Sequence, residues 1–236
     1  MAHGGNVEAG PVTRALENVI FGARPVVLAI FAIVTVIALV LASQLRVDAG
    51  FKKQIPLEHE YMKTFLDYEA DFGGANRVLV ALMARDGQEM FTPQFFSALE
   101  GLTSEVMAIE ATDNARVRSL FTPNVRFLEV VEDGFAGGNV IPNEFNAANA
   151  TAADFETIRS NVVKAGIVGR LVAKDWSGAM IWADLIPESE VNKLDYQAIA
   201  DQFEALRGKY EAQGFDVRII GFAKMVGDIS DGARSV

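Results

Sequence analysis

The amino-acid sequence predicts an α+β protein in which one N-terminal transmembrane helix is followed by an outer domain of helices and strands. Three patterns support this class: an uncharged apolar run over residues 25–45, segments whose apolar residues recur every three or four positions, and short apolar runs bounded by turn residues. The first pattern is typical of membrane spans, the second of amphipathic helices and the third of buried strands.

The apolar run Pro25–Leu45 has 21 residues without a charge and lies between Arg24 and Arg46. A helix of this length would be about 32 Å long, which matches the roughly 30 Å hydrocarbon core of a bilayer. A cleaved secretory signal is a poorer interpretation, because its apolar core spans only about 7–15 residues after a short leader. A buried helix of a soluble protein would normally show a polar stripe. We therefore expect a retained transmembrane helix.

Residues 1–24 are expected to form a cytoplasmic leader. Its segment Val12–Phe21 places four apolar side chains on one helical face, which suits an interfacial helix, although simple continuation of the transmembrane helix fits equally well. Two arginines precede the span and three basic residues follow it closely, which slightly disfavours a cytoplasmic N-terminus. A long following domain, however, translocates largely regardless of its charge.

Composition excludes several classes of function for the outer domain. The chain of 236 residues has no cysteine, so disulfide scaffolds, thiolate metal sites and cysteine nucleophiles are excluded. Its formal net charge is −10, and nearly all of the imbalance lies beyond residue 50. An acidic domain repels nucleic acids and anionic lipid headgroups, so we expect no nucleic-acid partner.

The outer domain begins with a predicted helix and a predicted strand. Aromatic residues recur every three or four positions over Leu57–Phe72, and Gly73-Gly74 follows, as is common after a helix. The nearly continuous apolar run Arg77–Ala84 predicts a strand buried on both faces.

A second helix and strand should complete a β-α-β unit. Thr92 followed by Pro93 predicts a helix start, and apolar residues at helical spacing continue to Ile109. A short strand is expected over Arg116–Leu120. The stretch Glu132–Ala150 is rich in Gly and Asn, and we expect it to be a long loop.

The rest of the chain repeats this order with variation. Thr151 and Asp154 resemble a capping box at the start of a helix, and residues 171–173 and 179–186 are expected to flank a hairpin turn. A helix over Tyr196–Tyr210 and a strand over Asp216–Ile220 follow. The combined order predicts a ferredoxin-like, split β-α-β layer of helices on a mainly antiparallel sheet, with one sheet face available for contact.

The last segment, residues 222–236, is predicted to be a helix that follows the outer domain at 46–221. Its apolar residues share one face, while Asp228 and Asp231 lie apart from it. A solvated face explains these two carboxylates, and a hinge or coupling role is the alternative.

No catalytic, cofactor-binding or metal-binding constellation is apparent in the sequence. The two histidines, His3 and His59, lie far apart, and none of the common nucleophile, zinc or nucleotide-binding motifs occurs. Several aromatic residues could line a hydrophobic passage, although aromatic side chains more often belong to a core. These candidates for a substrate path are Phe121, Phe127, Phe135 and Trp182, with Trp176 beside them.

Several short sequence segments, taken in their order along the chain, resemble the start of a transporter of the resistance-nodulation-division superfamily, in its MMPL-like branch of predicted exporters. After the first transmembrane helix come residues 51–59 and the run FGGANRVLV at 72–80, where that branch tends to carry F-G-G-x-N and its first porter strand. Further segments that resemble this branch are VRSLFT at 117–122, GRLVAKD at 169–175 and GFAKMVGDI at 221–229.

This resemblance implies a bacterial inner-membrane exporter whose large periplasmic porter domain follows its first helix. Such transporters are proton-driven and move lipids or other hydrophobic small molecules. The remaining transmembrane helices, with the proton relay, and a second porter domain would then lie beyond Val236. These parts, the lipid bilayer and a hydrophobic substrate are the expected partners. The alternative function is a single-pass anchored extracytoplasmic binding or adaptor domain. An anchored enzyme is disfavoured because no catalytic motif occurs in the sequence.

Overall fold

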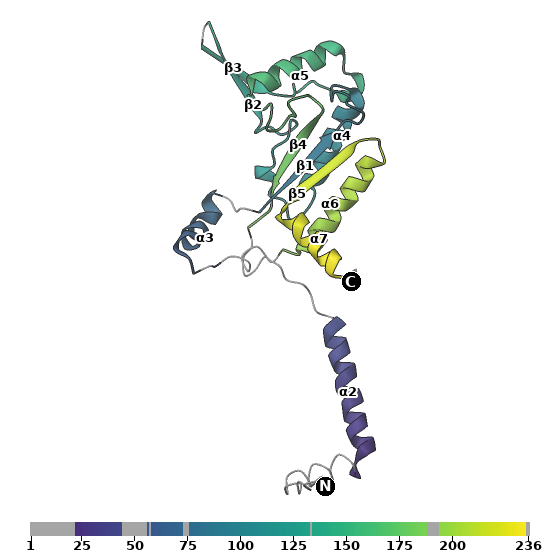
Figure 1. Ribbon diagram of the computed structural model, residues 1–236. Helices are drawn as coiled ribbons and strands as arrows, with labels where there is room; N and C mark the ends of the chain where they lie inside the picture. Colours follow the sequence, from purple (N-terminus) through teal and green to yellow (C-terminus); the bar gives the residue numbers. More distant parts are fainter. Residues whose placement is uncertain are drawn as a thin grey trace, which may run out of the picture. The chain divides into compact units, whose positions relative to one another are not determined.

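The computed structural model describes residues 22–43, 56, 58–72, 76–132, 134–187 and 194–234. The chain divides into two compact units, residues 1–48 and 49–236 (Figure 1). The described residues form a mixed α+β structure with small sheets, as the sequence predicts.

The first unit contains helix α2, Arg24–Ser43. Within the described part of the chain, it supplies the one helix that is long and apolar enough to cross a membrane; that stretch, Arg24–Ala42, has a mean hydropathy of 3.0 and none of it is buried. Thr35 donates its hydroxyl to the carbonyl of Phe31 at 2.8 Å, so this mid-helix polar group is satisfied without a neighbour. The predicted interfacial segment Val12–Phe21 lies outside the described residues.

The second unit begins with helix α3, Glu60–Phe72, which starts three residues later than the sequence suggests. The backbone N–H of Tyr61 bonds to His59 Nδ1 at 3.2 Å, which satisfies one of the free donors at the helix start. The glycine pair Gly73-Gly74, expected to end this helix, lies outside the described residues.

A three-stranded antiparallel sheet forms the centre of the second unit. Strand β1, Arg77–Met83, lies between β4, Gly178–Asp184, and β5, Asp216–Gly221 (Figure 1). Leu79 is opposite Trp182 on β4 and opposite Ile220 on β5, so these three side chains share one sheet face.

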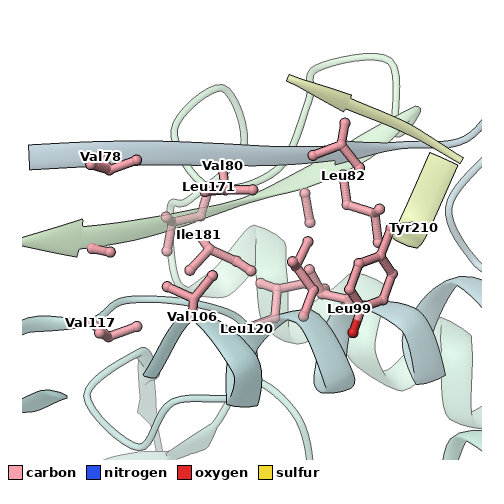
Figure 2. Close-up of a cluster of buried hydrophobic side chains, with 14 of the residues drawn as sticks. Val78, Val80, Leu82, Leu99, Val106, Val117, Leu120, Leu171, Ile181 and Tyr210 are labelled. Carbon is pink, nitrogen blue, oxygen red and sulfur yellow. The ribbon is translucent and has the colours of Figure 1, made fainter. Parts of the chain in front are cut away.

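The other face of the sheet forms the hydrophobic core. Val78, Val80 and Leu82 of β1 are fully buried, together with residues of helices α4, Pro93–Met107, and α6, Tyr196–Glu211 (Figure 2). The residues that alternate with them are only half-buried, so the prediction of a strand buried on both faces was wrong. The predicted strand was continuously apolar because Leu79 and Ala81 are apolar as well, although their side chains point to the less buried face.

The predicted helix caps are confirmed. The Thr92 side chain accepts from the N–H of Phe95, and Pro93 follows it at the first position of α4. Thr151 and Asp154 form the expected capping box at the start of α5, Ala152–Lys164. Asp195 caps α6 by accepting from the N–H of Ala198.

The strand predicted over Arg116–Leu120 was wrong. Asn114–Arg116 form a short 3-10 helix, η2, because the Asp113 side chain accepts from the N–H of Ala115 and turns the chain. Only isolated bridges join this region to β4, at Thr112–Leu185 and Arg118–Trp182. The turn expected at residues 174–178 is present, although residues 171–173 join β4 through one isolated bridge, between Val172 and Ala179.

The prediction of a long loop over Glu132–Ala150 was also wrong. Strand β3, Gly134–Asn139, pairs with β2, Arg126–Val131, in a second small sheet, and the 3-10 helix η3, Ala147–Asn149, follows. Glycine is depleted in strands, so β3 carries no recognisable strand pattern. Its pairing depends on β2, whose alternating residues supply the side chains that the glycines lack.

Helix α7, Phe222–Arg234, follows β5 directly and confirms the predicted terminal helix. Ala223 and Val226 are buried, whereas Met225 and Ile229 of the predicted apolar face remain about half exposed. Lys224 forms ion pairs with Glu204 on α6, at 3.0 Å, and with Asp228 on α7, so Asp228 is not simply solvated. The Asp231 side chain lies outside the described residues.

Gly178 at the start of β4 offers a test of the sheet packing. A Cβ at this position would collide with the backbone carbonyl of Leu82 on β1. We expect Gly178→Ala to lower the free energy of unfolding by roughly 2–3 kcal/mol, because backbone cannot move aside as a side chain can. Urea denaturation of the detergent-solubilised chain, followed by circular dichroism, measures this change.

The matched control is Gly208→Ala in α6, where nothing lies within 4 Å of the new Cβ. Because this glycine is exposed within a helix, its replacement by alanine should raise the free energy of unfolding by up to about 1 kcal/mol. Equal effects of the two substitutions would contradict the close approach of β1 and β4.

Candidate functional site

The accessible face of the central sheet carries a row of side chains from four segments. Ile220, Leu79 and Trp182 are opposite one another on β5, β1 and β4, and Arg118 continues the row through its bridge to Trp182. Ile220 is 60% exposed, in contrast to the complete burial of Val78 and Val80 on the inner face. We call this row and the surface around it the outer sheet face.

Trp182 is the one predicted site residue on this face. The guanidinium of Arg77 lies 5.1 Å from the centre of its indole ring, and the indole N–H donates to the sulfur of Met180 at 3.1 Å. Trp182 also borders a small cavity of about 120 Å³ with Arg118, Arg126 and other residues. Its ring is therefore held in place and half-buried, with one part beside an open space.

The other three predicted aromatic residues lie elsewhere. Phe121 packs against Phe96 and Phe145, with ring centres 6.2 and 6.5 Å apart, and contributes to the core. Phe127 lies beneath Lys164, whose Nζ is 5.5 Å from its ring centre. Phe135 is 75% exposed on the β2–β3 hairpin. Phe121 and Trp182 border separate cavities, and the role of the four residues in a substrate path stays a prediction.

Trp176, named beside them, belongs to a cluster around Arg159. The Arg159 guanidinium lies 4.2 Å from the ring centre of Phe91 and 4.8 Å from that of Trp176, and it pairs with Glu89 at 2.5 Å. These contacts connect α5 to the segment after β1 and to the turn before β4. The cluster joins three segments, and this accounts for both aromatic residues.

The β2–β3 hairpin exposes an apolar face, defined by Leu128, Val130 and Phe135. Val130 is opposite Phe135 in the ladder, so the three side chains are neighbours, and they are 66%, 80% and 75% exposed. The opposite face of the hairpin contacts α5 through Lys164, which pairs with Glu129 at 2.7 Å. A hairpin of two strands is marginally stable by itself, so this contact helps to hold it.

An open cleft of about 950 Å³ lies at one end of the sheet. It is bordered by the segment after β1, the first turn of α4 and the last turn of α6, with Phe95 and Phe215 among its apolar residues and Arg85, Gln88 and Gln94 among its polar ones. Arg85 is paired with Asp216 at 2.8 Å. The cleft is open and mixed in character, without a convergent catalytic group.

Glu105, Lys209 and Tyr210 link α4 to α6 at this end of the domain. Glu105 Oε1 lies 2.7 Å from both Lys209 Nζ and the Tyr210 hydroxyl. Burial and the bond to Glu105 raise the pKa of Tyr210, so its phenol remains a neutral donor. Burial acts to raise the pKa of Glu105, but the bonds from Lys209 and Tyr210 outweigh it and lower that pKa overall. The arrangement favours a permanent ion pair rather than acid–base catalysis.

Within the described residues, no group of three His, Asp or Glu side chains is placed to hold a metal ion. Sequence reasoning missed one arrangement, in which Arg118, Arg126 and Arg170 border the same small cavity as Trp182. The three arginines come from separate segments, so no local pattern in the sequence signals their meeting. The segments of Arg118 and Arg170 meet along β4, and the segment of Arg126 is held beside them by the bond from the Asn124 side chain to the carbonyl of Val117.

No protein-family model matches the chain, and no curated protein matches its sequence.

The Glu105 pair predicts a specific dependence of stability on pH. The pKa of Glu105 is lowered in the folded state. The ionised carboxylate therefore contributes fully to the free energy of unfolding above its unfolded pKa of roughly 4.5, and this contribution disappears as the pH falls through the folded pKa. We expect Glu105→Gln to cost about 1 kcal/mol at pH 7, given the partial exposure of the pair. Urea denaturation at several pH values should show this difference shrinking below pH 4.5, to about zero at the acid end.

Glu100→Gln is the control, since Glu100 is exposed on the same helix and no ion pair to its carboxylate is seen in the described structure. A difference for Glu105→Gln that persists unchanged at low pH would show that the ion pair is not its source.

Proposed function

We propose that this chain is the N-terminal part of a proton-driven exporter similar to the resistance-nodulation-division superfamily, in its MMPL-like branch. The observation that carries the proposal is the combination of a candidate transmembrane helix, α2, with an α+β domain whose central sheet has the strand order β4-β1-β5. Its main domain would lie on the periplasmic side of the bacterial inner membrane, and lipids or other hydrophobic small molecules would be its substrates.

The strand order supports a ferredoxin-like porter domain. In such a fold two β-α-β units interlock, so that the first strand lies centrally between two antiparallel neighbours. Here β1 and α4 lead to the bridge at Arg118, and β4, α6 and β5 form the second unit. The β2–β3 hairpin and α5 are then an insertion between the second and third strands of this pattern.

The exposed apolar surfaces support a domain that packs against neighbouring subdomains or a hydrophobic ligand. The outer sheet face leaves Ile220 exposed, and the hairpin exposes Leu128, Val130 and Phe135. Contiguous apolar surface of this kind is typical of sites that contact a protein or a hydrophobic ligand. In an exporter, neighbouring porter subdomains and the substrate would cover these surfaces.

The hairpin also favours the second candidate, a single-pass anchored binding or adaptor domain. An apolar hairpin supported by α5 could dock against another extracytoplasmic protein without any transport step. The two candidates differ in the membrane, because an exporter requires further transmembrane helices and an adaptor requires none.

Reading the gene beyond codon 236 separates the two candidates. The exporter proposal expects an apolar stretch of about 20 codons soon after this point, long enough for a second membrane span. A stop codon directly after Val236 would eliminate the exporter and favour the adaptor.

The absence of cysteine allows a direct test of membrane topology. A single cysteine at exposed Ser160 on α5 should react with a membrane-impermeant maleimide in intact spheroplasts, because the outer domain is proposed to face outward. A cysteine at Ala2 in the leader should react only after the membrane is opened. Protection of the Ser160 position in intact spheroplasts would place the domain in the cytoplasm and refute the proposed orientation.

The hairpin predicts a measurable tendency to associate. We expect Val130→Thr combined with Phe135→Ser to reduce self-association of the solubilised chain and its binding of a hydrophobic dye, because both side chains are highly exposed. The free energy of unfolding should change by less than about 0.5 kcal/mol. Analytical ultracentrifugation measures self-association, and dye fluorescence measures binding of the dye. Unchanged association would mean that copies of the chain do not associate through the hairpin.

A further inference from the structure

Three arginines and one tryptophan meet at a small cavity on the outer edge of β4. The cavity has a volume of about 120 Å³ and is bordered by Arg118, Arg126, Arg170 and Trp182, together with apolar residues from two of these segments. Arg118 belongs to the segment bridged to β4, Arg126 begins β2, and Arg170 lies in the turn that follows α5. We call this site the arginine pocket.

Backbone hydrogen bonds fix the segments that carry these arginines. Arg118 and Trp182 exchange two bonds of 2.9 Å, and the N–H of Met180 bonds to the carbonyl of Leu171 at 2.7 Å, directly after Arg170. The Asn124 side chain, two residues before Arg126, donates to the carbonyl of Val117 at 2.8 Å. The backbone of all three arginines is therefore held by the sheet edge or by a bonded turn, while the three residues remain exposed to solvent.

The arginine pocket differs from the rest of the domain in its charge pairing. In the described structure, no acidic side chain lies within ion-pairing distance of Arg118, Arg126 or Arg170, and none borders the cavity. The other arginines of the outer domain whose side chains are described all have an acidic partner: Arg77 with Asp184, Arg85 and Arg218 with Asp216, Arg116 with Asp113, Arg159 with Glu89, and Arg207 with Glu204.

This arrangement is unusual in a chain with a net charge of −10. Abundant carboxylates could have neutralised three arginines that border one cavity, yet no described acidic residue borders it. Like charges that share a site repel one another, and an anion in the cavity would relieve that repulsion. The guanidinium group is planar and presents a fork of donors that matches the oxygens of phosphate and carboxylate.

The apolar wall of the pocket defines the ligand further. Val125 and Leu171 are each 5% exposed, and Ile167 and Trp182 are half-buried beside them. At about 120 Å³ the cavity is smaller than the roughly 300–1,000 Å³ typical of pockets that enclose whole drug-sized ligands. It accommodates a small charged group, while an attached apolar chain would continue across Trp182 onto the outer sheet face.

We propose that the arginine pocket binds the oxyanion of a phosphate-bearing molecule, with Arg118, Arg126 and Arg170 as the donors and Trp182 as the apolar contact. The same chemistry serves free phosphate and the headgroup of an anionic amphiphile. The proposal does not depend on a transport function, since an adaptor domain could hold the same ligand.

The experiment uses the full chain in dodecyl maltoside, a detergent without phosphate. Isothermal titration calorimetry measures the binding of inorganic phosphate and of short-chain dihexanoyl phosphatidic acid, with dihexanoylglycerol as the uncharged analogue. We expect Arg126→Gln and Arg170→Gln each to weaken binding roughly 5- to 10-fold, as for exposed charge-assisted hydrogen bonds. The indole N–H resonance of Trp182, assigned from its loss in Trp182→Phe, should shift on binding.

Arg218→Gln is the matched control, because it removes one positive charge from an exposed side chain of β5 outside the arginine pocket. This variant should change affinity less than about 2-fold. Binding of both anions supports a site for any phosphate, and binding of phosphatidic acid alone supports a headgroup site. Equal binding of dihexanoylglycerol, equal weakening by Arg218→Gln, or no binding of either anion at millimolar concentration would each overturn the proposal.

Discussion

Burial of one face of β1 is the constraint on which the rest of the domain depends. Val78, Val80 and Leu82 are completely removed from solvent, and each contributes roughly 1.5–3 kcal/mol when fully buried. Strand geometry then requires that the alternating residues point to the opposite face. The outer sheet face is thus a direct consequence of the core.

The edge of β4 shows how the domain ends this sheet. Continuous unpaired edges invite association with other chains, and proteins avoid this with short or interrupted pairing. Here two separate segments bridge β4, Arg118 at Trp182 and Val172 at Ala179. Because each segment pairs only briefly, its neighbouring side chains are free to leave the sheet. Arg118 and Arg170 reach one cavity for this reason, and Arg126 joins them where β2 begins.

The accessible surfaces of the domain have different physical characters. The β2–β3 hairpin exposes apolar side chains, whereas the arginine pocket concentrates positive charge in an acidic protein. Surface ion pairs elsewhere contribute little to stability, generally below about 1 kcal/mol. Their absence at one cavity therefore costs the fold little, and leaves three guanidinium groups available to a ligand.

The sequence by itself determined the candidate membrane span, the mixed α+β class and most of the helix boundaries. These depend on local chemistry: an uncharged apolar run, the caps at Thr92 and Thr151, and regular apolar spacing. The sequence did not reveal β3, whose glycines pair only because β2 lies beside them, and it suggested a strand where the Asp113 turn permits a single bridge. The meeting of Arg118, Arg126 and Arg170 was decided by tertiary structure alone, because backbone bonds to the edge of β4 hold the segments of Arg118 and Arg170, and β2 begins with Arg126 beside the same cavity.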